Sequence, residues 1–132
     1  MNTKFIMTTS AVVLGITGIL LTFIPDEILI HFSIETNRIT LFLTQILGAL
    51  YFAFAMLNWA TKTSLIGGIY NRPIAIANFT HFLIAGLALI KGIISNPSVF
   101  YTIWIAGIFY CVFGISFGII LFRHPANKTK SN

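Results

Sequence analysis

The sequence predicts an all-α integral membrane protein, a four-helix bundle whose helices run up-down-up-down through the bilayer. Four apolar runs of about twenty residues fill most of the chain, which is the length that spans ~30 Å of hydrocarbon at 1.5 Å per residue. The composition agrees, with 57% hydrophobic residues, 8% charged residues and a mean hydropathy of +0.92. The runs lack both the polar face of a soluble helix and the strict alternation of a barrel strand.

We expect the spans at residues 5–24, 39–60, 74–94 and 99–122, forming one transmembrane domain over residues 1–122. No small-x-small cleavage site precedes the acidic pair Asp26 and Glu27, so the first run is interpreted as an uncleaved helix and not as a signal peptide. Residues 123–132 form a basic tail. The sequence therefore predicts one membrane domain and no second domain.

Basic residues predict the orientation, because cytoplasmic connections are enriched in Lys and Arg. With four spans, six of the eight basic residues fall on one side and two on the other. The first group is Lys4, Lys62, Arg72, Arg123, Lys128 and Lys130, and the second is Arg38 and Lys91. We expect both termini and the second connection to be cytoplasmic. The net charge of +5 then points to anionic lipid head groups, and nucleic acid is not expected as a partner.

Small residues indicate where helices approach one another, since close backbone contact drives association in lipid. Gly114-x-x-x-Gly118 in the last span predicts either packing within the bundle, which we favour, or a homodimer. Cys111 is interpreted as a packing residue, because a single cysteine excludes an internal disulfide. The predicted seams consist of Gly107, Cys111, Gly114 and Gly118 in the last span, Ala11, Gly15 and Gly18 in the first, and Thr44 and Gly48 in the second.

Polar side chains near the membrane centre form the first candidate site, a ligand pocket lined by Tyr51, Asn78, His81 and Tyr110. At 1.5 Å per residue, Tyr51, His81 and Tyr110 come to similar depth in their spans. Ionisable residues inside a membrane are costly and are functional candidates by default. A histidine bonded to a tyrosine can equally be a structural link between helices, and this alternative stays open.

Helical spacing predicts which face of the third span carries this pocket. Asn78 and His81 share a face with Ala85 and Ala88, so we expect this small or polar stripe to face the bundle interior. The opposite face should meet lipid. It carries Phe82, Leu83 and Leu87.

A second candidate site lies in the connection between the second and third spans. Asn58, Trp59, Asn71 and Arg72 flank this basic connection and could bind a phosphate head group or a partner protein. The alternative is structural, with Trp59 as an interfacial anchor and Gly67 and Gly68 allowing a sharp turn.

Residues 25–35 predict a short helix at the membrane surface, because Pro25 and two acids suit a helix N-terminus. Over this helix we expect Glu27, His31 and Glu35 to share one face. One helix rarely supplies a complete metal site, and no metal is predicted. Haem is disfavoured, since neither His31 nor His124 lies at the depth of His81. No cofactor is expected.

The order of elements resembles one known group of proteins. Gly15-Ile-Thr-Gly18 leads into Phe23-Ile-Pro-Asp-Glu27, and a Gly/Ala-rich second span follows. This arrangement is similar to the DoxX-like group of small bacterial four-span proteins. The resemblance implies a bacterial inner-membrane bundle and, for some relatives, an association with quinone-linked redox proteins. It assigns no individual residue.

These observations favour a binding or accessory membrane protein that holds a lipid-like or quinone-like ligand or a partner membrane subunit. A small transporter or channel is the alternative, although the polar residues form no continuous path and no span contains an acid. An enzyme acting on lipid is third, because the sequence offers no catalytic motif and no nucleophile beside His81.

Overall fold

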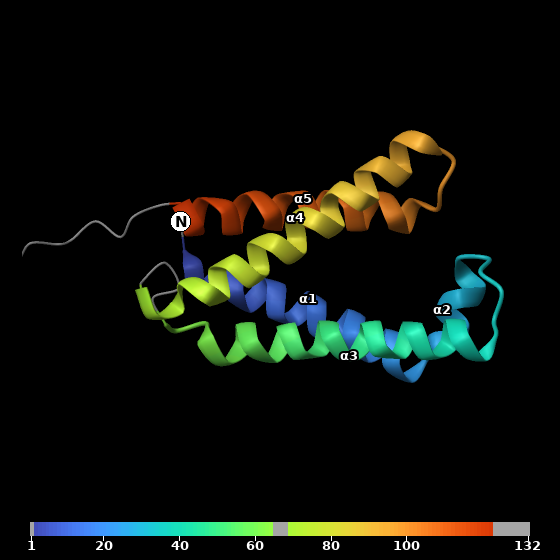
Figure 1. The fold of residues 1–132 in the computed structure, drawn as a ribbon, viewed down its shortest axis with the longest axis horizontal. Helices are drawn as coiled ribbons and strands as arrows, with labels where there is room; N and C mark the ends of the chain where they lie inside the picture. Colours follow the sequence, from blue (N-terminus) through green and yellow to red (C-terminus); the bar gives the residue numbers. More distant parts are fainter. Residues whose placement is uncertain (1, 65–68, 123–132) are drawn as a thin grey trace, which may run out of the picture. The chain divides into compact units, whose positions relative to one another are not determined.

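A computed structural model describes residues 2–64 and 69–122, which fold into two compact units of helices, the first ending at Thr63 and the second beginning at Ser64 (Figure 1). The basic tail, Gly67 and Gly68 lie outside these described residues. The described part contains the helices α1 (Thr3–Phe23), α2 (Pro25–His31), α3 (Arg38–Thr61), α4 (Arg72–Ser95) and α5 (Tyr101–Phe122), and the short 3₁₀ helix η1 (Ile69–Asn71).

Four of these helices, α1, α3, α4 and α5, are long and apolar enough to cross a membrane. Their ends agree with the predicted spans to within two residues. The all-helical class and the four candidate spans are therefore confirmed. The single four-helix domain remains a prediction.

Side-chain caps determine where the helices of the first unit begin, and one left-handed residue determines where the chain turns between them. The Asn2 side chain accepts a hydrogen bond from the Phe5 backbone N–H at the start of α1. The Asn37 side chain caps α3 and the Thr40 hydroxyl accepts from the Asn37 N–H, which is a reciprocal capping box. Ser33 has φ of 55°, a left-handed conformation that reverses the chain after α2.

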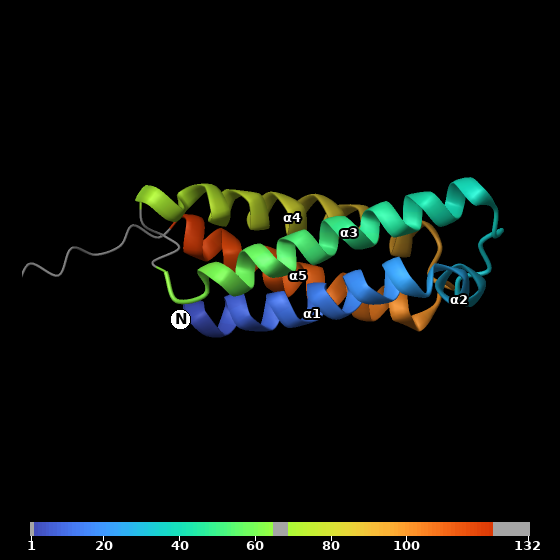
Figure 2. The same cartoon turned by 90° about the horizontal axis from the view of Figure 1, so that it is seen from below.

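The helices α1 and α3 form an antiparallel hairpin, and they lie side by side in Figure 2. At Gly18 an added Cβ would lie 2.7 Å from the Phe52 backbone nitrogen and 2.8 Å from the Gly48 carbonyl oxygen. At Gly15 it would lie 3.5 Å from the Ala55 Cβ. The small residues predicted as a seam therefore form the contact between these two helices.

The helices α4 and α5 form the hairpin of the second unit. An added Cβ at Gly114 would lie 3.7 Å from the Phe82 carbonyl carbon, and one at Gly118 would lie 3.1 Å from the Phe79 ring. The predicted glycine face of α5 thus packs against α4 of the same chain. Of the two alternatives for Gly114 and Gly118, packing within the chain and a homodimer, this contact corresponds to the first.

Phe82 occupies the centre of this second hairpin, so the prediction that it faces lipid is wrong. Its side chain is 0% exposed and stacks on Phe117 with ring centroids 5.6 Å apart. The buried stripe of α4 consists of Ala75, Asn78, Phe82, Gly86 and Ile93. It is rotated from the predicted stripe, which shares only Asn78 with it, because the Phe82 ring packs against the Phe113 and Phe117 rings of α5. Leu83 and Leu87 are exposed, as predicted.

Candidate functional site

The second hairpin brings together two of the residues predicted to line the ligand pocket. The Tyr110 hydroxyl lies 3.4 Å from His81 Nε2, and the two ring centroids are 5.5 Å apart. His81 is the tenth residue of α4, and Tyr110 is the tenth residue of α5. This polar pair therefore lies near the middle of two long apolar helices.

The fold of the hairpin explains why these two side chains meet. Gly86 lets α5 approach so closely that an added Cβ there would lie 3.5 Å from the Tyr110 Cβ. The tyrosine ring also packs edge-on against Phe82, with centroids 5.3 Å apart. Aromatic packing thus holds the phenol beside the imidazole. A phenol and an imidazole together can donate to or accept from a carbonyl or hydroxyl group of a ligand.

Asn78 lies one helical turn before His81 and is completely buried. Its Nδ2 group donates to the backbone carbonyl of Ile74 at 3.0 Å. This bond satisfies part of the amide inside its own helix. The structure therefore places Asn78 on the packed stripe of α4, one turn from the His81–Tyr110 pair.

Tyr51, the fourth residue of the predicted pocket, belongs to α3 and hence to the first unit. Its side chain has an interaction partner and is partly exposed. Its proximity to His81 remains a prediction.

The residues of the second candidate site have different surroundings. Asn58 is 0% exposed, and its Nδ2 group donates to the Ser10 hydroxyl at 3.0 Å across the α1–α3 seam. Ser10 in turn donates to the Met7 carbonyl oxygen. Asn58 thus links two helices within the seam, where it is not accessible to a head group.

The neighbouring Trp59 is 48% exposed, and the Lys62 ammonium lies 3.0 Å from the centroid of its ring. Asn71 and Arg72 belong to the second unit, at the end of η1 and the start of α4. A site that joins these residues to Trp59 remains a prediction.

The short helix predicted after the first span is present as α2, with Pro25 in its first turn. It ends at His31, and the left-handed Ser33 follows, so Glu35 does not continue the face of Glu27 and His31. Among the described residues no group of three or more His, Cys, Asp or Glu side chains could hold a metal ion.

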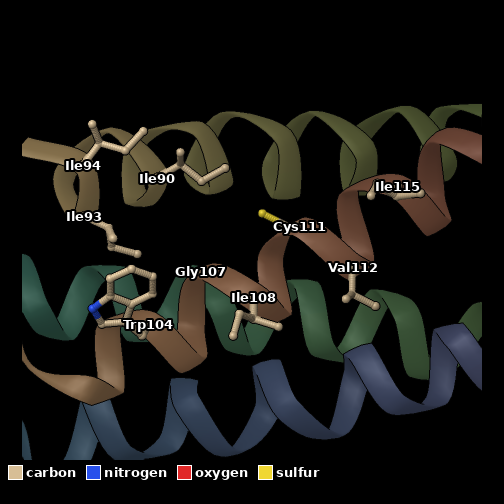
Figure 3. A pocket seen from close by; sticks show the side chains of 9 residues that line it. All are labelled: Ile90, Ile93, Ile94, Trp104, Gly107, Ile108, Cys111, Val112 and Ile115. Atoms are coloured by element: carbon tan, nitrogen blue, oxygen red, sulfur yellow. The ribbon is translucent and has the colours of Figure 1, made fainter. Parts of the chain in front are cut away.

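An apolar groove on the second hairpin was not predicted from the sequence. It has a volume of about 370 Å³ and lies between α4 and α5 (Figure 3). Its lining includes Ile90, Ile94, Trp104, Ile108, Val112 and Ile115. His81 is not among the lining residues, so the groove and the polar pair are separate features of this hairpin. Hydropathy cannot reveal such a groove, because its lining is as apolar as the rest of both spans.

The first hairpin carries a groove of the same volume, about 370 Å³, between α1 and α3.

Comparison with protein families, curated proteins and solved structures finds no match for this chain.

Proposed function

We propose that this chain is a multi-pass protein of the bacterial inner membrane, threaded up-down-up-down with both termini in the cytoplasm. Four apolar helices support the membrane assignment, and the excess of basic residues on one side supports the orientation. The resemblance of its order of elements to the DoxX-like group supports the bacterial membrane.

Within that membrane, the protein serves as a binding or accessory protein for a lipid-like or quinone-like molecule. The observation that carries this proposal is the His81–Tyr110 pair at 3.4 Å in the middle of two apolar helices. Placing an ionisable side chain at that depth is costly, and a purely structural link could use groups that are cheaper to bury. The pair supplies the polar contact that orients the head of an otherwise apolar ligand.

The experiment compares two Tyr→Phe variants of the full chain in lipid nanodiscs, with decylubiquinone as the probe. Tyr110→Phe keeps the ring packed on Phe82 and removes only the hydroxyl. We expect about tenfold weaker binding, since an unpaired polar partner costs about 1–3 kcal/mol. Tyr101→Phe is the matched control, because Tyr101 is 69% exposed at the start of the same helix.

Circular dichroism and thermal unfolding in the same nanodiscs separate binding from folding. Unchanged probe affinity in Tyr110→Phe would refute the binding proposal. A lowered unfolding temperature with no probe bound by the parent protein would instead assign the pair a structural role. Probe flux across the membrane by the parent protein would favour the transporter.

A further inference from the structure

The groove of the first hairpin faces outward from the α1–α3 seam. It is lined from α1 by Val12, Ile16 and Ile19, and from α3 by Phe52, Met56 and Trp59. All six side chains are between 43% and 56% exposed. An apolar groove of about 370 Å³ on a membrane-spanning hairpin has the shape and chemistry to accept a hydrocarbon chain.

Trp59 connects this groove to a positive charge. Its ring lines the groove, and the Lys62 ammonium lies 3.0 Å from the ring centroid. The cation–π contact holds the ammonium beside the end of the groove that Trp59 lines, and we call this end the mouth of the groove. Lys62 directly follows Thr61, the last residue of α3, so the charge lies where that helix leaves the apolar layer.

Lys4 adds a second cation at the same end of the hairpin. The antiparallel pairs Gly18–Gly48 and Ser10–Asn58 place the first turn of α1 beside the C-terminal end of α3. Lys4 lies in that first turn and is exposed. Two lysines therefore lie at the end of the hairpin toward which the groove runs.

The acids of the chain are all at the other end of this hairpin. Asp26, Glu27 and Glu35 are the only carboxylate side chains in the sequence, and they lie in α2 and the segment before α3. The 21 residues of α1 put about 30 Å between its two ends. The charge at the mouth of the groove is thus uncompensated and suits an anion.

We propose that this hairpin binds an anionic phospholipid, with the phosphate at Lys62 and Lys4 and one acyl chain in the groove beside Trp59. The apolar groove and the two cations match the two parts of such a lipid. This proposal concerns the first unit alone and does not depend on the ligand proposed for the His81–Tyr110 pair of the second unit.

Fluorescence quenching of Trp59 tests the proposal in the full chain. The second tryptophan is removed by Trp104→Phe, and the protein is placed in nanodiscs of phosphatidylcholine. Phosphatidylglycerol with brominated acyl chains is then titrated, because a bromine that contacts the indole quenches its emission. We expect quenching at a lower mole fraction than with brominated phosphatidylcholine.

Substitutions in this background separate the head group from the chain. Lys62→Gln and Lys4→Gln should each raise the phosphatidylglycerol needed by about fivefold, the ratio that corresponds to about 1 kcal/mol per lysine. Arg38→Gln removes a cation at the opposite end and should leave the titration unchanged. Val12→Phe fills the groove and should reduce quenching by both lipids.

Three outcomes would overturn the proposal. Equal quenching by the two brominated lipids would mean unselective contact with bulk lipid. An unchanged titration in Lys62→Gln would remove the phosphate contact. A dimer that Val12→Phe dissociates would show that a second copy of the chain covers the groove.

Discussion

At the residue scale, Phe82 shows how strongly the environment of a side chain depends on the rotation of its helix. Phe82 and Leu83 are adjacent apolar residues of α4, and hydropathy does not distinguish them. The first is 0% exposed in the α4–α5 seam and the second is 40% exposed. Their different surroundings follow from Gly86 and Gly114, which determine where the two helices meet.

This difference predicts unequal effects of two neighbouring substitutions. Phe82→Ala should destabilise the protein by about 3 kcal/mol, because it leaves a cavity between the helices. This value is at the low end for a core Phe→Ala change, since the Phe82 side chain remains in lipid, and not in water, when the helices separate. Leu83→Ala should change stability by less than about 0.5 kcal/mol. Unfolding in a detergent series, followed by circular dichroism, measures both. Equal losses would mean that Phe82 is not a packing centre.

Asn58 shows a different limit of sequence reasoning. Its position beside Trp59 at the end of a span suggests a polar site at the membrane surface. The structure turns it into the seam, where it donates to Ser10. The signal was present, since Ser10 also interrupts an apolar helix, but pairing the two requires the register of α1 against α3.

At the element scale, glycines determine how closely the helices of each hairpin approach. Gly18 and Gly48 let the backbones of α1 and α3 come within contact of each other. Gly92 of α4 is different, because an added Cβ there would meet nothing within 4 Å. Glycine therefore permits a close helix contact in the first hairpin, whereas Gly92 of α4 makes no such contact.

Gly18→Ala should destabilise the first hairpin by about 1–3 kcal/mol, because the added methyl group meets backbone atoms of α3 that cannot move without separating the helices. Gly92→Ala is the matched control and should be neutral or stabilising by up to about 1 kcal/mol. Thermal unfolding in nanodiscs compares the two. A Gly18→Ala protein as stable as the parent would contradict the close crossing.

The element boundaries were largely predictable and the short connecting helix only in part. The lengths of the apolar runs predict where the long helices begin and end to within two residues. For α2, the left-handed turn at Ser33 ends the helix before Glu35, and serine gives no strong signal for that conformation. The predicted stripe of Glu27, His31 and Glu35 failed for this reason.

At the scale of the whole molecule, the predicted threading has a direct test. Cys111→Ala gives a cysteine-free chain, to which Thr36→Cys, Ser64→Cys or Ser98→Cys is added singly. A membrane-impermeant maleimide on intact bacterial cells should label positions 36 and 98, and position 64 only after lysis. Labelling of position 64 in intact cells would invert the proposed orientation.

The fold class and the four spans follow from the sequence because bilayer thickness and backbone hydrogen bonding allow few alternatives. The candidate sites follow less well, because a polar residue in an apolar run can face a seam, a groove or lipid. His81 and Tyr110, predicted at similar depth, lie within 3.4 Å of each other, and the pocket they would line with Tyr51 remains a prediction. The grooves lined by Trp59 and Trp104 could not be predicted, because they depend on side-chain shape and hydropathy does not describe shape.

The division of the chain near Thr63 has a consequence for biosynthesis. The contacts between α1 and α3 join residues that precede Ser64. The nascent polypeptide therefore holds a complete helix pair once those residues have left the ribosome. The membrane insertion machinery can release this pair into lipid while the later helices are still being translated, and the protein can mature in two sequential insertion events.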